Sequence, residues 1–349
     1  MDRDRIEAFL ERFVGLASGA TTIGLLAVAD RSGLLARMRD DGSGSVDSLA
    51  AGAGLETRYV REILSGLTAA GVIDYEPATE VFTLPPEHAL FLADEDSPYF
   101  MGGWLDMLPA VMSRVDEVAR ATREGGGVGF DEFGPDLVRG IDRGNGPSQR
   151  VFLVNRWLPA VPGLVERLQA GLVVADVGCG VGTAALAMAR AFPASSVHGF
   201  DVSAESLQVA RSRSEDVGNV SFTMASVDTI PLDPPFDFVT SFDVIHDLAD
   251  PMAGLRRIRA SLADDGQYLM MEPNAGSRIE ANLSDRGAML YGISTLHCMT
   301  QSLAAGGVGL GAAWGRELAE EYAREAGFGR FTPLEGITNK FSAFYLLEG

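Results

Sequence analysis

Two glycines that could form part of a ligand-binding turn follow a short apolar segment in the middle of the chain. Gly178 and Gly180 come directly after residues 172–177, a run typical of a strand buried on both faces. Glycines at such a turn let the backbone approach a ligand closely, because they carry no Cβ. Asp201 follows the next predicted strand, residues 196–200, where a carboxylate can accept hydrogen bonds from both hydroxyls of a ribose. The pattern predicts a nucleoside site at the carboxyl ends of two neighbouring strands.

The spacing of the glycines distinguishes two classes of nucleotide-binding enzyme. Dinucleotide folds use G-x-G-x-x-G before a pyrophosphate, whereas this chain has G-x-G-x-G with Asp176 two residues before the first glycine. Asp176 would repel a pyrophosphate but can orient a cationic amino-acid group. The segment resembles the class I methyltransferases, which bind S-adenosylmethionine, and this resemblance implies cofactor contacts from Asp176, Gly178, Gly180 and Asp201. The alternative is a glycine-rich turn that binds no ligand.

An alternating pattern of strands and helices surrounds this turn and predicts an α/β fold with a Rossmann-like sheet. Further strands are expected over residues 220–224, 236–241 and 267–271, and a terminal pair near 330–333 and 339–347. Because ligands bind at the carboxyl ends of strands in open α/β sheets, the predicted cofactor site also includes residues at those ends: Val202, Ser226, Val227 and Phe242. In class I methyltransferases an acidic residue usually stands where this chain has Ser226, so its hydroxyl or a backbone carbonyl would have to contact the adenine.

His246 and Asp247 leave the carboxyl end of the fourth predicted strand and face the same crevice. Histidine is suited to remove a proton because its unperturbed pKa lies near neutrality. The pair, followed by x-x-Asp, resembles small-molecule O-methyltransferases, in which that histidine deprotonates a hydroxyl. The alternative is a histidine that caps the following helix.

A second histidine, His297, lies in the segment 291–299, ahead of a glycine-rich run over residues 306–315. Together with the other motifs, these segments resemble bacterial phenylpyruvate and other α-keto acid C-methyltransferases. That resemblance implies that His246 and His297 hold an iron or zinc ion, which the substrate chelates. A metal bound to ketone and carboxylate oxygens stabilises an enolate, with Asp247 as base or as a partner of the metal ligands. Without the resemblance, a buried structural histidine is the preferred interpretation of His297.

Residues 1–96 follow the order helix, turn, helix and hairpin of a winged helix. The expected elements are helices over residues 4–30, 48–53 and 58–70 and a hairpin of residues 72–75 and 81–84. The module holds 8 arginines and 17 acidic residues, whereas DNA affinity depends on neutralising phosphates. It resembles the dimerisation domain that precedes the catalytic domain in many small-molecule methyltransferases, so we expect a homodimer. A ligand-sensing transcriptional regulator is the alternative.

Residues 97–166 are expected to form a helical linker, and residues 167–349 the methyltransferase domain. The linker carries an aromatic and methionine-rich stripe around Trp104, which suits either interdomain core or the lid of an apolar substrate pocket. The stripe indicates a small aromatic or branched aliphatic substrate.

Composition adds broad expectations about location and partners. A net charge of −20 argues against nucleic acid or an anionic membrane as a partner. Cys179 and Cys298 offer no disulfide framework, which fits a reducing, cytoplasmic compartment. No uninterrupted apolar run reaches the roughly 18 residues that a membrane span needs. The sequence therefore predicts an S-adenosylmethionine-dependent enzyme, with metal-assisted C-methylation of a small α-keto acid as the preferred reaction and O-methylation by His246 as the alternative.

Overall fold

The computed structural model describes all residues, 1–349, and the chain folds into two compact units. Unit 1 comprises Met1–Pro109 and Arg139–Ser148, and unit 2 comprises Ala110–Val138 and Gln149–Gly349. The section expected to be a helical linker, residues 97–166, is thus divided between the two units.

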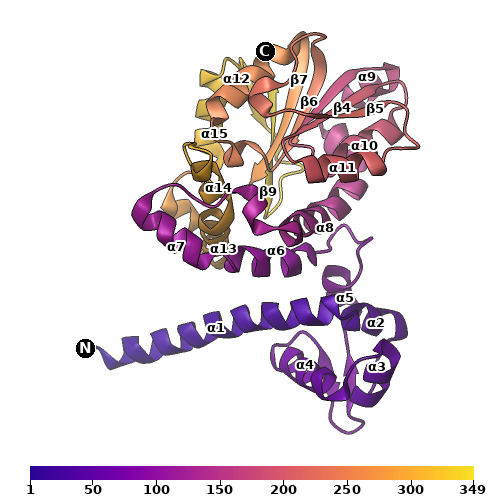
Figure 1. The fold of residues 1–349 in the computed structure, drawn as a ribbon, viewed down its shortest axis with the longest axis vertical. Coiled ribbons are helices and arrows are strands. Elements are labelled where there is room, and N and C mark those ends of the chain that lie inside the picture. The colour runs from indigo at the N-terminus through magenta and orange to yellow at the C-terminus, as the bar shows by residue number, and fades with distance from the viewer. The chain divides into compact units, whose positions relative to one another are not determined.

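Unit 1 contains the predicted winged helix (Figure 1). Ser45 begins α3 by accepting a hydrogen bond from the backbone nitrogen of Ser48, as expected for an N-cap serine. Two short helices, α2 and α5, were not predicted from the sequence. The elements are α1 Arg3–Arg31, α2 Leu34–Asp41, α3 Val46–Ala53, α4 Thr57–Ala69, β1 Asp74–Glu76, β2 Val81–Thr83 and α5 Pro86–Leu92, with α6 Gly103–Met112 and α8 Pro135–Phe152 shared between the units.

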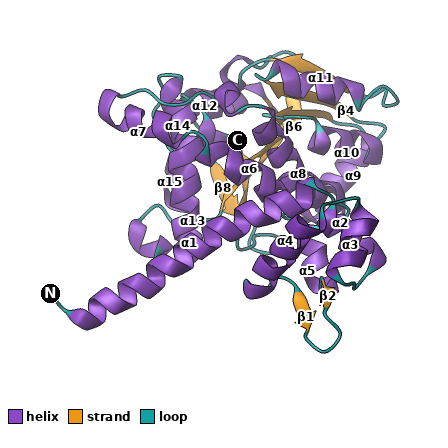
Figure 2. Cartoon of the chain, turned by 60° about the horizontal axis from the view of Figure 1, so that its bottom comes forward, coloured by secondary structure: helices purple, strands orange, loops and turns teal.

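Helix α1 extends well beyond the core of unit 1 (Figure 2). Its last turns are buried there through Leu26, Ala27 and Ala29, whereas residues 1–20 are exposed throughout. By length and composition alone α1 could cross a membrane. Core helices of soluble proteins and signal sequences pass the same test. The sequence predicted this helix but not its apolar length, because a few charged residues interrupt its apolar ones.

A buried carboxylate in α6 forms ion pairs with three arginines of unit 1. Asp106 is 1% exposed, and its oxygens lie 2.7 Å from Arg139, 2.6 Å from Arg143 and 3.5 Å from Arg31. Arg143 also lies 2.9 Å from Asp30 of α1. These ion pairs connect α1, α6 and the first turns of α8 within the unit.

Unit 2 is built on a seven-stranded sheet in the order β5-β4-β3-β6-β7-β9-β8. The first five strands in this order are parallel, and β9 runs antiparallel to both β7 and β8. The strands are β3 Val173–Val177, β4 Ser196–Asp201, β5 Val220–Met224, β6 Phe236–Phe242, β7 Leu262–Pro273, β8 Arg330–Pro333 and β9 Ser342–Glu348. The predicted Rossmann-like α/β fold is confirmed.

Helices cover both faces of this sheet, as Figure 1 shows. One core cluster joins α9, α10 and α11 to one face, and a second joins α12 and α15 to the other. The helices of this unit are α7 Val115–Glu124, α9 Leu164–Ala170, α10 Thr183–Ala191, α11 Ala204–Ser212, α12 Pro251–Ser261, α13 Asp285–Ile293, α14 Met299–Ala304 and α15 Gly315–Glu325. With both faces covered, functional groups reach a ligand from the strand ends.

Strand β7 is longer than the sequence predicts. The expected strand over residues 267–271 stops before Glu272 and Pro273, which have low strand propensity. The structure extends the strand through both residues because β9 pairs with it, Glu272 facing Ala343 and Pro273 facing Ser342 in register. This extension carries Glu272 to the edge at which the candidate site lies.

Candidate active site

The glycine turn and Asp201 come together at the ends of β3 and β4, as predicted. Asp201 Oδ2 accepts a hydrogen bond from the backbone nitrogen of Gly180 at 2.8 Å, and Oδ1 accepts one from Ser203 at 2.8 Å. Gly178 has a φ of 67°, and a Cβ there would collide with the side chain of Val244. Glycine is therefore required at this position for both conformation and space.

Asp176 lies beneath this turn and is fully buried. Its Oδ1 accepts a hydrogen bond of 2.8 Å from the Thr240 hydroxyl, whereas Oδ2 has no partner. Burial raises the pKa of Asp176 to about 7, and the charge of Asp201 adds to this rise against the Thr240 hydrogen bond. An unpaired buried carboxylate oxygen is costly, so a cationic ligand group would be stabilised here.

The other predicted cofactor residues differ in their surroundings. Val202 is 67% exposed directly after Asp201 and can pack against a flat apolar ring. Val227 and Phe242 are buried in the core clusters on opposite faces of the sheet. Their side chains therefore pack in the core beneath the strand ends and are not exposed there.

Ser226 has an acidic partner that the sequence interpretation missed. Its hydroxyl hydrogen-bonds with the carboxylate of exposed Asp228, and it lies 2.9 Å from the hydroxyl of Thr229. A carboxylate is thus present two residues beyond the position where class I methyltransferases usually carry one.

His246 lies in the 3₁₀ turn Ile245–Asp247, which leaves the carboxyl end of β6. Its ring is 3% exposed, and Nδ1 lies 2.6 Å from Oε2 of Glu272, which is 1% exposed on the neighbouring strand β7. The backbone nitrogen of Ile245 donates to Oε1 of the same carboxylate at 2.9 Å. With Glu272 ionised, Nδ1 of His246 carries a proton, and Nε2 is the nitrogen available for chemistry.

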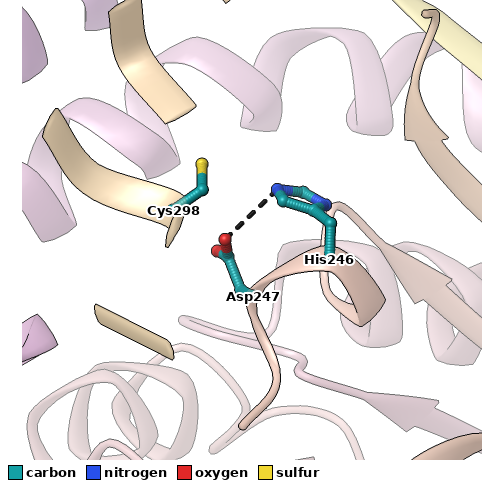
Figure 3. Close-up of side chains that lie close together, drawn as sticks. All are labelled: His246, Asp247 and Cys298. Carbon is teal, nitrogen blue, oxygen red and sulfur yellow. Dashed lines mark ion pairs between the residues drawn. The ribbon is translucent and has the colours of Figure 1, made fainter. Parts of the chain in front are cut away.

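Asp247 and Cys298 lie on the Nε2 side of this imidazole, as Figure 3 shows. Asp247 Oδ1 is 3.3 Å from Nε2 of His246 but forms no hydrogen bond there and has no other partner. One donor atom from each of His246, Asp247 and Cys298 lies within 4.8 Å of the others. The sequence interpretation did not assign a role to Cys298.

His297, the second predicted metal ligand, is not a member of this group of donors. It lies in the π-helix Ser294–Cys298, a conformation that is frequent at functional sites. Its buried ring packs edge-on against Phe133 at 5.1 Å and near Phe130 at 6.1 Å, and its Nδ1 has no partner. The structure therefore brings Cys298 into the group with His246, where the sequence predicted His297.

The two histidines experience opposite electrostatic surroundings. Burial opposes protonation of His246, but the carboxylates of Asp247 and Glu272 outweigh it and raise its pKa well above the ordinary value. Burial lowers the pKa of His297, and the charge of His246 adds to this effect against the attraction of Asp247. These surroundings favour the protonated form of His246 and the neutral form of His297.

A third carboxylate stands at the end of β6. Asp243 has a left-handed φ of 58°, an unusual conformation for a residue other than glycine. Burial raises its pKa to about 7; the positive charge of His246 opposes this rise, and the carboxylates of Glu272 and Asp247 add to it. Such backbone conformations concentrate at functional sites.

Glu272 is the most important site residue that the sequence interpretation missed. A signal was present, since an acidic residue at the carboxyl end of an apolar strand follows the same rule that identified Asp201. Nothing local indicated that this carboxylate would face His246, 26 residues earlier.

Comparison with known proteins identifies a domain in each half of the chain. Residues 168–327 match the family model of a methyltransferase domain, and residues 19–94 match the Rv2258c-like winged HTH domain. The mitochondrial ubiquinone biosynthesis O-methyltransferase of Candida albicans is 35% identical over 97 residues, which cover 26% of this chain and 30% of that protein. The matches to curated relatives thus span less than half of those proteins.

Solved structures share the fold over nearly the whole chain. The mitomycin 7-O-methyltransferase MmcR aligns over 100% of both chains with a TM-score of 0.74 and 16% identity. The O-methyltransferase NcsB1 from neocarzinostatin biosynthesis, solved with S-adenosylmethionine and 2-hydroxy-5-methyl naphthoic acid, covers 94% of this chain and 96% of its own, with a TM-score of 0.62 and 20% identity. Residues 168–327 thus form a methyltransferase domain, residues 19–94 form a winged HTH domain ahead of it, and the whole chain shares its fold with methyltransferases of the same two-domain architecture.

Proposed function

We propose that the chain transfers the methyl group of S-adenosylmethionine to a hydroxyl oxygen of a small aromatic molecule, with His246 as the general base. The observation that carries this proposal is the buried pair of His246 and Glu272, which leaves Nε2 of the imidazole on the side of Asp247 and Cys298. The structural neighbours named above are O-methyltransferases, and one was solved with a hydroxynaphthoic acid. Both facts support a hydroxyl acceptor on an aromatic ring.

The cofactor would supply an electrophilic methyl group on a sulfonium. The residues present fit such a ligand, because Asp176 holds an unpartnered buried oxygen that suits an ammonium group. Asp201 stands where both ribose hydroxyls can donate to its carboxylate, and exposed Val202 can pack against the adenine. Ser226 and Asp228 are candidates to accept a hydrogen bond from the adenine amine.

We expect Asp201→Ala to weaken cofactor binding by about 1–3 kcal/mol, the usual cost of leaving buried polar partners unpaired. The variant would also free the backbone nitrogen of Gly180. Isothermal titration calorimetry with S-adenosylmethionine measures the change, with Asp216→Ala on the exposed surface of the same unit as a control. Unchanged affinity in Asp201→Ala would remove this carboxylate from the binding site.

The proposed chemistry needs only one proton transfer. Nε2 of His246 would accept the hydroxyl proton as the oxygen–methyl bond forms and the methyl–sulfur bond breaks, and the charge of Glu272 would stabilise the imidazolium through Nδ1. Asp247 is the second candidate group, since its unpartnered Oδ1 can accept a hydrogen bond from the substrate. By orienting the substrate hydroxyl toward the methyl group, these side chains would supply much of the remaining reduction in the activation free energy.

Metal-assisted C-methylation of an α-keto acid is the second candidate function. It is favoured by the convergence of imidazole, carboxylate and thiol donors within 4.8 Å, a combination that suits zinc or iron. The relatives and neighbours named above do not support it. The ligand set would comprise His246, Asp247 and Cys298, with His297 outside this group.

One assay separates the two candidates. Methyl transfer from ¹³C-methyl-labelled cofactor is followed by NMR with a hydroxynaphthoic acid and with phenylpyruvate, each with and without a chelator. We expect the hydroxyl compound to gain an O–CH₃ signal at a rate that the chelator leaves unchanged, with negligible metal in the purified protein. A C–CH₃ product from phenylpyruvate that disappears with the chelator, together with metal that is lost in Cys298→Ser, would establish the second candidate instead.

We further propose that the protein is a homodimer joined through α1. Ile6, Phe9, Leu10 and Phe13 are each more than half exposed at helical spacing on this helix, and an apolar face of this size indicates a protein partner. We expect Phe9→Glu combined with Phe13→Glu to convert a dimer into a monomer in sedimentation velocity, while Glu7→Gln combined with Glu11→Gln does not. A monomeric wild-type protein or vesicle binding through α1 would contradict this assignment, and tight salt-sensitive binding of duplex DNA would instead support a transcriptional regulator.

A further inference from the structure

The glycine-rich run over residues 306–315, which the sequence singled out, lies directly along the turn that carries His246. The backbone nitrogen of Gly311 donates to the carbonyl of His246 at 3.2 Å, and that of Val308 donates to Ala249 at 3.0 Å. At Gly307 a Cβ would collide with the backbone of Ala249. The absence of side chains thus lets this segment pack against the backbone of the catalytic turn.

Trp314 is the second-to-last residue of this segment, and its indole hydrogen-bonds with the carboxylate of Glu272 that holds His246. Trp314 is 3% exposed, and its Nε1 donates to Oε2 of Glu272 at 3.0 Å. The same oxygen lies 2.6 Å from Nδ1 of His246. Oε2 therefore interacts with the tryptophan and the histidine together, while Oε1 interacts with the backbone nitrogens of Val244 and Ile245.

The indole itself is held in place from two sides. Tyr322 of α15 packs edge-on against it with ring centroids 6.0 Å apart. Gly315, the next residue, has a φ of 75°, and a Cβ there would collide with the backbone of Gly276 and Ser277. The position of the indole N–H is thus determined by the packing of the segment and does not depend on a ligand.

We propose that Trp314 is a positioning residue that fixes the carboxylate of Glu272 and, through it, the ring of His246. The proposal rests on the assignment of His246 as the reactive group. A carboxylate with donors on both oxygens cannot rotate without breaking hydrogen bonds, so the imidazole that it holds keeps one orientation. Without the indole donor, Oε2 keeps only the hydrogen bond to His246, and the carboxylate is held against rotation by its backbone bonds at Oε1 alone, so the imidazole is oriented less tightly.

The first test observes the hydrogen bond itself and needs no substrate. The chain has three tryptophans, so the indole N–H signal of Trp314 is assigned in a ¹⁵N NMR spectrum by its loss in Trp314→Phe. We expect Glu272→Gln to move this signal upfield, because a neutral amide oxygen is a weaker acceptor than a carboxylate. A signal that Glu272→Gln leaves in place would overturn the proposal, whatever reaction the enzyme performs.

The second test measures, from kcat, whether the effects of replacing Trp314 and Glu272 depend on each other. We expect Trp314→Phe to lower kcat about 10-fold, as for other residues that orient a reactive side chain through a hydrogen bond, and to leave KM for the cofactor unchanged. Tyr322→Leu removes a ring that packs on the indole but keeps the indole N–H and Glu272, and we expect a clearly smaller loss of kcat than in Trp314→Phe. In the Glu272→Gln background, Trp314→Phe should add less than about a twofold further loss, because both changes break the same link. If the loss of kcat in the double variant equals the product of the two single losses, Trp314 does not act through Glu272. If Tyr322→Leu loses as much kcat as Trp314→Phe, Trp314 acts only through packing.

Discussion

Replacing His246 with alanine is expected to reduce kcat by about 10²–10⁴-fold, the usual contribution of a general base. The imidazole is buried and is held on Nδ1 by Glu272, and the carboxylate of Asp247 lies 3.3 Å from its Nε2. Because His246 is not among the predicted cofactor contacts, calorimetry should show nearly unchanged S-adenosylmethionine affinity. The rate is measured under saturating cofactor with the hydroxyl substrate identified by the labelling assay.

The control for this variant is His198→Ala, which removes a half-buried histidine of the same unit that bonds only to Ser221. We expect that variant to keep its kcat. A His246→Ala enzyme that retains most of the wild-type rate would show that the substrate loses its proton without this histidine.

The pH dependence of kcat provides an independent check of the same base. Asp247 and Glu272 outweigh burial and raise the pKa of His246, and only the deprotonated imidazole can accept a proton. The rate should therefore fall as pH decreases through a limb that lies above the ordinary histidine value of about 6.5. A limb at or below that value would contradict the electrostatic account of the site.

Replacing Asp106 with alanine is expected to destabilise unit 1 by about 3–5 kcal/mol, the range for breaking a buried ion pair from one side. The change leaves Arg143, itself largely buried, without its 2.6 Å partner. Burial acts against the ionised form of Asp106, but Arg139 and Arg143 outweigh it and lower its pKa. The stabilisation is consequently present above the ordinary carboxyl pKa of about 4 and is lost as pH falls through the lowered value.

Hydrogen exchange followed by mass spectrometry can locate this effect. In Asp106→Ala, peptides from α1, α6 and the start of α8 should exchange faster, whereas peptides from the sheet of unit 2 serve as the internal reference. The matched variant Asp40→Ala removes an exposed partner of Arg39 and should leave exchange unchanged, because exposed ion pairs contribute little. Equal protection in Asp106→Ala and wild type would mean that the arginines find other partners.

The meeting of the glycine turn with Asp201 was predictable from the sequence. The glycine turn, Asp176 and Asp201 lie within about one βαβ unit, where the order of strand, turn and helix determines which groups meet. Local patterns also located His246 at a strand end. The order of helix, turn, helix and hairpin was sufficient for the winged helix, because each of these elements is signalled by neighbouring residues.

The catalytic half depends on contacts that no local pattern encodes. Glu272 meets His246 because β6 and β7 pair in parallel with Phe242 facing Met271, which places the next residue of β7 beside the turn after β6. That register arises from the packing of the whole sheet.

The sequence by itself determined the fold class, the methyltransferase domain and the meeting of the glycine turn with Asp201, since these follow from residue types at short spacing. Only the tertiary structure decided which groups surround His246. The π-helix over Ser294–Cys298 holds one more residue per turn than an α-helix, so Cys298 comes close to His246 and Asp247 while His297 packs against Phe133. Trp314 reaches Glu272 from 42 residues away, because the glycine-rich segment packs closely against the turn of His246.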